Sequence, residues 1–351
     1  MVHQIAKSSP AASLSLFKQQ YLQLVEPKKL AWPERDQLRL PEIQAWIYDH
    51  MFNTESLPYS PPERYELRVL KQLMSRVEEA TIDPNEDEIS DDLMSRLSTL
   101  LSSKLPSEAL SAQHKSYVTY SSILENGDRR PPHENITLLE ARSVLSSSGT
   151  TGLRTWEAAL HLGSFLTTEE GGAFVKNRNV LELGAGTGFL SVLCAKHLGA
   201  ARVVATDGDH GVVQSLAENL SLNGLRSSNA VRTEVLQWSR LPRTSWLKEE
   251  INEYPCDVVL GADLIYDKEF VPSLIDTIRD LIDIFPTLDV VIAATVRNEE
   301  TVDMFTTRCE ESGLWLNDIS FSAAPETENR SFFYSTDMPL RIIHIRDESS
   351  E

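Results

Sequence analysis

Apolar residues in the second half of the chain occur in short runs separated by amphipathic stretches. The runs predict seven strands, at residues 180–183, 202–206, 230–238, 257–262, 289–296, 314–322 and 340–345. Helical spacing between them predicts helices around residues 190–198, 210–222, 271–285 and 299–312. Alternation of strands and helices is typical of a mostly parallel sheet with helices on both faces. Because no convincing helix separates the last two strands, they are expected to form an antiparallel hairpin at one edge.

Residues 1–125 carry a different pattern, with apolar side chains at helical spacing. Leu70, Met74 and Val77 are one such set, and Ser90 is placed to cap a helix whose first turn is acidic. A polar, proline-rich stretch follows. We therefore predict an α-helical N-terminal domain over residues 1–125, a linker over 126–135 and a second domain over 136–351.

The balance of charge limits the partners of the protein. The 351 residues include 52 Asp and Glu against 33 Lys and Arg, a formal net charge of -19. Such a chain lacks the basic surface that neutralises phosphates, so direct nucleic-acid binding is not expected. Six of the carboxylates fall within residues 83–92, with no base among them. This segment is either an exposed acidic loop or a docking surface for a basic partner.

Compartment and metal content follow from the remaining composition. The three cysteines are far apart, with no spacing typical of a metal site or a disulfide framework. We therefore expect free thiols in a reducing cytoplasm and no bound metal. The N-terminal residues have no signal-peptide pattern, and no apolar run is long enough to cross a membrane. A monomer is expected.

A glycine-rich turn follows the first predicted strand of the second domain. Gly184, Gly186 and Gly188 alternate after Glu182, directly before an apolar helical segment. The order G-x-G-x-G differs from the dinucleotide fingerprint, and no Lys-Ser or Lys-Thr follows as in a phosphate-binding P-loop. Asp207 ends the second strand, where a carboxylate faces the ribose of a nucleoside bound over such a turn. The spacing predicts a nucleoside cofactor.

The pattern Glu-x-Gly-x-Gly-x-Gly resembles the first motif of class I methyltransferases, which use S-adenosyl-L-methionine. In a Rossmann-like sheet of this class, the ligand lies at the carboxyl ends of the strands. The cofactor is then expected to meet the residues that follow strands one to four. These are Gly184, Ala185 and Gly186, then Asp207, then Gln237 and Trp238, and then Ala262. Glu182, which precedes the glycines in the same motif, is also predicted to be a cofactor residue.

The segment after the fourth strand indicates which group accepts the methyl. Asp263-Leu-Ile-Tyr266 stands where amide and nucleic-acid methyltransferases commonly carry Asn-Pro-Pro-Tyr, and its D-x-x-Y pattern resembles the lysine-specific branch. A lysine amine has a pKa of about 10.4, so deprotonation near neutral pH costs roughly 4 kcal/mol. A narrow, partly dry channel disfavours the ammonium form. Tyr266 is predicted to line that channel, and Asp263 to orient the amine or the cofactor.

Three further stretches narrow the resemblance. Residues 148–160 read Ser-Gly-Thr-Thr-Gly-Leu-Arg-Thr-Trp-Glu-Ala-Ala-Leu, residues 262–266 read Ala-Asp-Leu-Ile-Tyr, and residues 295–301 read Thr-Val-Arg-Asn-Glu-Glu-Thr. Together they resemble the elongation factor 2 lysine methyltransferase family over roughly residues 140–345. The resemblance implies methyl transfer from S-adenosylmethionine to one lysine of translation elongation factor 2, up to trimethyllysine.

Site residues follow from the same resemblance. Family cofactor contacts match Trp156, Gly184, Gly186, Asp207, Trp238 and Ala262, and the lysine-site motif matches Asp263 and Tyr266. The acidic partner usual for the adenine amino group is replaced here by Gln237. Arg297 and Asn298 follow strand five at the same edge, where they either bind substrate or take part in structural salt bridges.

Two alternatives stay open on the sequence. The first alternative is a lysine methyltransferase of the same branch that acts on another substrate, such as a chaperone. The second is an interaction module that keeps the fold but has lost catalysis. The intact glycines, Asp207 and the pair Asp263 and Tyr266 argue against loss of catalysis.

Overall fold

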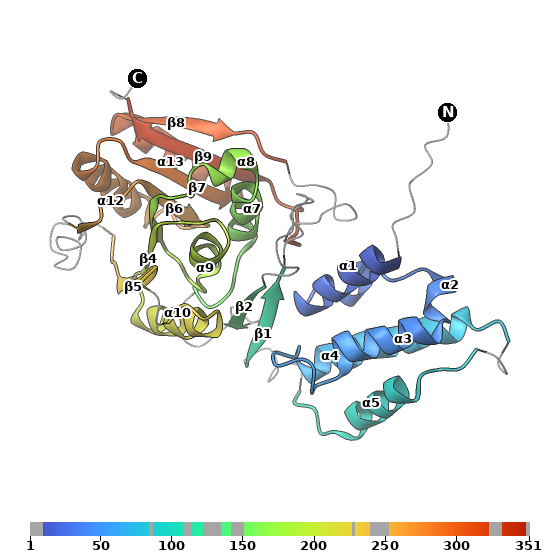
Figure 1. The fold of residues 1–351 in the computed structure, drawn as a ribbon. Coiled ribbons are helices and arrows are strands. Elements are labelled where there is room, and N and C mark those ends of the chain that lie inside the picture. Colours follow the sequence, from blue (N-terminus) through green and yellow to red (C-terminus); the bar gives the residue numbers. More distant parts are fainter. Residues whose placement is uncertain are drawn as a thin grey trace, which may run out of the picture. The chain divides into compact units, whose positions relative to one another are not determined.

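The computed structural model describes residues 10–83, 87–107, 114–121, 135–141, 151–226, 229–238, 253–322 and 332–348. The chain forms two compact units, one of residues 1–121 with 141–143, and one of residues 122–140 with 144–351 (Figure 1). The predicted linker at 126–135 lies outside the described residues except for Asn135, and the predicted domain boundaries remain a proposal.

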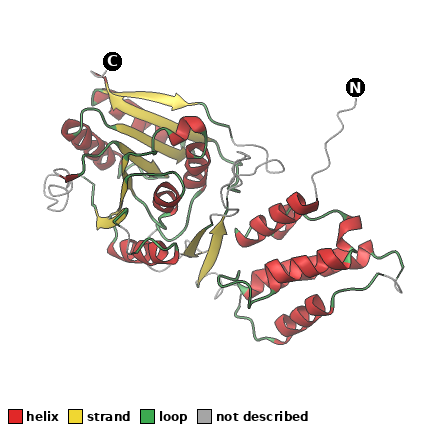
Figure 2. Ribbon diagram, viewed as in Figure 1, coloured by secondary structure: helices red, strands yellow, loops and turns green. Residues whose placement is uncertain are grey.

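The first unit is built mainly from helices, which Figure 2 shows in red. Their bounds are α1 (Pro10–Leu22), η1 (Pro27–Lys29), α2 (Arg35–Leu38), α3 (Pro41–Ile47), η2 (Tyr48–Phe52), α4 (Glu63–Ala80) and α5 (Asp91–Ser102). The predicted helical pattern is confirmed in α4, where Leu70, Met74 and Val77 are buried. The predicted cap is confirmed as well, because the Oγ atom of Ser90 accepts a hydrogen bond from the amide of Leu93.

One element of the first unit differs from the helical prediction. Residues Lys115–Tyr120 form strand β1. The stretch Lys-Ser-Tyr-Val-Thr-Tyr is rich in aromatic and β-branched residues, which favour extended backbone. The interior of the unit contains the aromatic side chains Phe17, Tyr21, Phe52 and Tyr65, all fully buried.

The second unit contains the predicted seven-stranded sheet (Figure 1). Its strands are β3 (Asn179–Leu183), β4 (Arg202–Asp207), β5 (Val231–Val235), β6 (Val258–Ala262), β7 (Asp289–Thr295), β8 (Leu314–Ile319) and β9 (Leu340–Asp347). The order is β5-β4-β3-β6-β7-β9-β8. Neighbours from β5 to β7 pair in parallel, whereas β9 is antiparallel to both β7 and β8. The prediction of a terminal antiparallel pair is confirmed, and β9 is inserted between β7 and β8.

Helices cover both faces of the sheet, as predicted. They are α7 (Glu157–Leu166), α8 (Glu169–Gly172), α9 (Phe189–Lys196), α10 (His210–Leu222), α12 (Val271–Ile284) and α13 (Glu299–Glu311). One core joins α12 and α13 to the sheet through Val259, Ile278, Ile292 and Phe305. The chain order runs from β3 to β5 in one direction and from β6 to β7 in the other. Right-handed crossovers therefore place α9 and α10 on the face opposite α12.

A short strand, β2 (Ile136–Ala141), begins the described part of this unit and was not predicted. Asn223 of the α10 C-cap and Asn219 bond its backbone: the Oδ1 atom of Asn223 accepts from the amide of Thr137, and that of Asn219 accepts from the amide of Leu139. Strand β2 is thereby fastened along α10.

The described part of the chain shows no helix that is both apolar and long enough to pass through a bilayer. Within the same ranges, no three His, Cys, Asp or Glu side chains gather as metal ligands would.

Candidate active site

The turn between β3 and α9 has a backbone that requires glycine. Gly184, Gly186 and Gly188 have φ angles of 61°, 53° and 86°, a region that side chains disfavour. A Cβ atom on Gly184 would lie 2.5 Å from a methyl carbon of Leu264, and one on Gly186 would lie 3.0 Å from the carbonyl oxygen of Gly152. The three glycines thus let the turn pass close beneath neighbouring segments.

Asp207, at the end of β4, is joined to this turn. Its Oδ2 atom accepts a hydrogen bond of 3.2 Å from the amide of Gly186, and its Oδ1 atom accepts one of 3.1 Å from the amide of Asp209. Burial raises the pKa of the Asp207 carboxyl. Each carboxylate oxygen keeps a second lone pair, so the group can still accept hydrogen bonds from a ligand.

Glu182 has a different environment. Its side chain is buried, and one carboxylate oxygen accepts a hydrogen bond from the hydroxyl of Ser191, on α9. Burial raises the pKa of Glu182 to about 8, and the nearby charge of Asp207 acts in the same direction. The structure therefore places this predicted cofactor residue in the interior, against α9.

Ala185, Gln237 and Trp238 occupy three different environments at this edge. Ala185 is buried, with its amide donating to the carbonyl of Thr206. Gln237 is exposed, two residues after the end of β5. Trp238 is partly buried against the core beneath α12, with its ring centroid 6.4 Å from that of Phe270.

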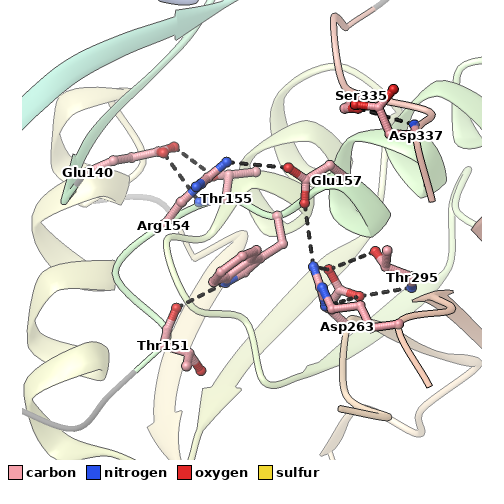
Figure 3. Close-up of polar contacts among 11 residues, drawn as sticks. Glu140, Thr151, Arg154, Thr155, Glu157, Asp263, Thr295, Ser335 and Asp337 are labelled. Carbon is pink, nitrogen blue, oxygen red and sulfur yellow. Dashed lines mark hydrogen bonds and ion pairs between the residues drawn. The ribbon is translucent and has the colours of Figure 1, made fainter. Parts of the chain in front are cut away.

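Asp263 follows Ala262 and has a φ of 53°. Its Oδ1 atom accepts a hydrogen bond of 2.9 Å from the amide of Thr295, and its Oδ2 atom accepts one of 3.2 Å from the Thr295 hydroxyl (Figure 3). Both oxygens also lie 3.4 Å from nitrogens of the Arg297 guanidinium. Only 6% of this side chain is exposed. The carboxylate is thus held by the segment that follows β7.

Tyr266 lies further along the same loop and is 50% exposed. Its ring centroid is 6.2 Å from that of Phe270. Partial burial raises the pKa of the tyrosine. An exposed aromatic ring beside the carboxyl ends of β3 and β6 is available to a ligand or substrate.

Arg297 and Asn298 have well-defined structural partners. The Arg297 guanidinium pairs with Asp263 and also lies 3.5 Å from a carboxylate oxygen of Glu157. Asn298 caps α13, because its Oδ1 atom accepts from the amide of Glu300. Of the two readings given above for this pair, the geometry favours the salt-bridged structural role.

Trp156 is positioned by residues from two loops. Its indole nitrogen donates a hydrogen bond of 3.1 Å to the carbonyl of Thr151. The guanidinium carbons of Arg154 and Arg297 each lie 5.0 Å from its ring centroid, within cation–π range. The structure therefore brings Trp156, Arg297 and Asp263 into one connected group.

Three polar residues that hold the site together were not predicted. The Thr155 hydroxyl donates a hydrogen bond of 2.6 Å to Glu140 of β2 and also lies 2.6 Å from the hydroxyl of Thr187, within the glycine turn. All three side chains are buried. A single acid within the apolar stretch Ile-Thr-Leu-Leu-Glu-Ala was the available signal, since a buried carboxylate requires partners.

The sheet order, the glycine turn and the acid at the end of the neighbouring strand define a class I, seven-strand methyltransferase. A family model described as lysine methyltransferase matches residues 138–311. Protein-lysine N-methyltransferase EFM3 of Chaetomium thermophilum is 44% identical over 327 residues, which is 93% of this chain and 96% of that protein. The chain belongs to this lysine methyltransferase family.

Two further relatives are more distant. Protein-lysine N-methyltransferase EEF2KMT of Homo sapiens is 27% identical over 95% of this chain and 96% of its own length. Protein-lysine N-methyltransferase EFM3 of Saccharomyces cerevisiae is 33% identical over 51% of this chain and 54% of its own length. The chain is accordingly an S-adenosylmethionine-dependent protein-lysine N-methyltransferase.

Proposed function

We propose that this enzyme methylates a lysine of translation elongation factor 2, up to trimethyllysine. The observation that carries the proposal is the juxtaposition of a side-chain-free turn, a carboxylate and an exposed aromatic ring at one edge of the sheet. Gly184 and Asp207 supply the first two, and Tyr266 follows the adjacent strand β6. The choice of substrate is supported by the three sequence stretches that resemble the elongation factor 2 lysine methyltransferases.

The residues at this edge fit S-adenosylmethionine. The turn at Gly184 and Gly186 offers bare backbone to the methionine part, and Asp207 keeps lone pairs for the two hydroxyls of a ribose. Ala262 is small, and Gln237 is exposed where an adenine edge would need a polar partner. Trp156, Ala185 and Trp238 complete the proposed cofactor contacts. Bound there, the cofactor supplies an electrophilic methyl group on a sulfonium.

Glu182 is proposed to act on the cofactor from beneath the turn. Its carboxyl is buried and bonded to Ser191, so it supports the turn on which the cofactor would lie. Because its pKa is raised to about 8, it is largely neutral at physiological pH.

The acceptor lysine must reach the site as a neutral amine. Tyr266 is proposed to line its channel, where a partly buried aromatic surface disfavours the ammonium form. Asp263 is proposed to fix the loop that carries Tyr266, because Thr295 and Arg297 already bond its oxygens. A neutral amine held in this channel could accept the methyl group that bound S-adenosylmethionine would supply, with water as the proposed acceptor of the lysine proton.

We further propose a monomeric enzyme that acts in the cytoplasm, with residues 1–125 as a domain that contacts the protein substrate. The docking role is proposed because every proposed cofactor contact belongs to the other unit, which leaves the helical unit available for the protein substrate. The helical unit then has either a docking role or a purely stabilising one.

The test uses the full-length protein, purified elongation factor 2 and S-adenosylmethionine labelled in its methyl group. We expect label on one lysine, located by mass spectrometry. Asp207→Ala is expected to weaken cofactor binding by roughly 2 kcal/mol in calorimetry. Asp257→Asn is the matched control, because Asp257 also accepts a backbone hydrogen bond, from Asn179, but precedes β6 at the opposite edge.

Other results would redirect the proposal. Label on a different protein of a lysate, with none on elongation factor 2, would assign another substrate. Cofactor binding without methylation of any protein would indicate an interaction module.

A further inference from the structure

Four charged side chains of the second unit alternate in sign beside the proposed lysine site. The Arg154 guanidinium lies 3.3 Å from one carboxylate oxygen of Glu157 (Figure 3). The Arg297 guanidinium lies 3.5 Å from the other oxygen. Arg297 in turn lies 3.4 Å from Asp263. The two cations and two carboxylates cancel, so this row, Arg154–Glu157–Arg297–Asp263, carries no net formal charge.

Arg297 connects three segments of the second unit. It belongs to the segment between β7 and α13, pairs with Asp263 after β6, and meets Glu157 and Trp156 at the start of α7. Its side chain is 40% exposed. Its fork to Asp263 is longer than the 2.9 Å bond from the Thr295 amide. Thr295 therefore fixes the carboxylate, and the main contribution of Arg297 is its charge.

The positive charge of Arg297 matters because the site must accept the substrate lysine as a neutral amine. A carboxylate within about 4–6 Å of an amine favours its ammonium form, whereas methyl transfer requires the neutral form. Asp263 lies three residues before Tyr266, the proposed wall of the lysine channel. Without a cation beside it, Asp263 would attract the substrate lysine and also keep it protonated.

Resting on the lysine site put forward under the proposed function, we propose that Arg297 is a charge-neutralising positioning residue. Its guanidinium offsets the carboxylate of Asp263, so that the bound lysine loses its proton at neutral pH. Arg154 does the same for Glu157. Arg297 touches neither substrate nor cofactor in this role and acts through Asp263.

Other charged groups face the same loop and have to stay constant in any test. Asp207 and Asp267 both act electrostatically on Tyr266. Lys268 is paired with Glu300 at 2.5 Å, and Glu299 is exposed beside it at the start of α13. Because single substitutions at Arg297 leave these groups in place, their effect cancels when variants are compared.

The experiment measures the single-turnover rate of methyl transfer against pH, from about 6.5 to 9.5, with the full-length protein. Arg297→Met removes the charge and keeps an apolar chain, while Arg297→Lys keeps the charge. Arg341→Met is the control, because Arg341 on β9 has a similarly exposed guanidinium, paired at 2.6 Å with Asp318 on the neighbouring strand β8.

We expect Arg297→Met to move the rising limb of the rate profile up by about one pH unit. The rate near pH 7.5 should then fall about tenfold and return towards the wild-type value at the highest pH. The KM for the protein substrate should not rise. Arg297→Lys should keep the wild-type limb, and Arg341→Met should match the wild type throughout.

A rate that falls equally at every pH, with a higher KM, would overturn the proposal, because it would assign Arg297 to substrate binding or to packing and not to the protonation of the lysine. Thermal melting monitors folding of each variant. Failure of the proposed substrate is a separate result: the wild type would not label elongation factor 2, and the same profiles would be recorded with the lysate protein that it does label.

Discussion

The hydroxyl of Ser191 donates a hydrogen bond to the carboxylate of Glu182 inside the second unit, directly beneath the glycine turn. Burial raises the pKa of Glu182 to about 8 although this hydrogen bond opposes the shift. The desolvation of the carboxylate therefore outweighs its one good partner. The protonation state of Glu182 is consequently coupled to folding.

Glu182→Gln is expected to change how stability depends on pH. The folded pKa of about 8 exceeds the unfolded value of 4.5, so the folded state holds an extra proton between these values and the wild type loses stability as pH rises through this window. Glutamine does not titrate. The stability of the variant relative to the wild type should therefore increase by on the order of 2 kcal/mol between pH 6 and pH 8, measured by urea unfolding. Parallel pH dependences of the two proteins would contradict the assignment.

Gly184→Ala should impair cofactor binding and also destabilise the turn. Its Cβ atom would lie 2.5 Å from Leu264, and its φ of 61° is unfavourable for alanine. Gly199→Ala is the matched control, since Gly199 has a φ of 71° with no atom within 4 Å of the added carbon. We expect both variants to lose about 1 kcal/mol of stability from backbone strain, and only Gly184→Ala to lose S-adenosylmethionine affinity in calorimetry. Equal affinities would mean that the glycine serves the turn alone.

Tyr266→Ala should lower turnover at least tenfold while changing S-adenosylmethionine affinity little, because the ring is proposed to line the lysine channel. The exposed ring of Trp315, on β8, provides the control Trp315→Ala, which should keep wild-type turnover. Mass spectrometry would also report any altered mixture of mono-, di- and trimethyllysine. Normal turnover of the Tyr266 variant would assign the ring to packing.

The acidic segment 83–92 can now be tested more selectively. Asp87 accepts hydrogen bonds from the amides of Ile82 and Asp83, which lower its pKa, so it maintains the turn and should be kept. Asp91 and Asp92 are exposed in the first turn of α5, whereas Glu86 lies outside the described residues. These two aspartates are the better targets.

Replacing Asp91 and Asp92 by asparagine should raise the KM for the protein substrate several-fold at low ionic strength, with little effect at high salt, because salt screens exposed charges. Cofactor affinity should not change. Glu78 and Glu79, exposed on α4 of the same unit, provide the control Glu78→Gln with Glu79→Gln. If both double variants behave like the wild type at every salt concentration, the docking role of this segment is wrong.

Local sequence was sufficient to locate the seven strands of the large sheet and the helices predicted between them. The bounds of α10, His210–Leu222, agree with the predicted helix, and the glycine turn was located from alternation at Gly184, Gly186 and Gly188. These features depend on near neighbours, because apolar periodicity and left-handed backbone are encoded within a few residues. The parallel sheet followed because the order of strands and helices limits the possible connections.

Strands β1 and β2 were not predicted, because each is only six residues long, which is too short for its apolar positions to establish a period. The roles of individual side chains depended even more on distant parts of the chain. Asp263 finds Thr295 across 32 residues, and Arg297 meets Glu157 from the other end of the domain. Such contacts form where strands that are distant in the sequence end next to one another in the sheet. Local sequence therefore does not predict them. The sequence by itself determined which chemistry-bearing residues lie at the carboxyl edge of the sheet. Only the tertiary structure decided which carboxylate is buried, which is paired, and which remains open to a ligand, because burial and ion pairing depend on atoms brought together by folding.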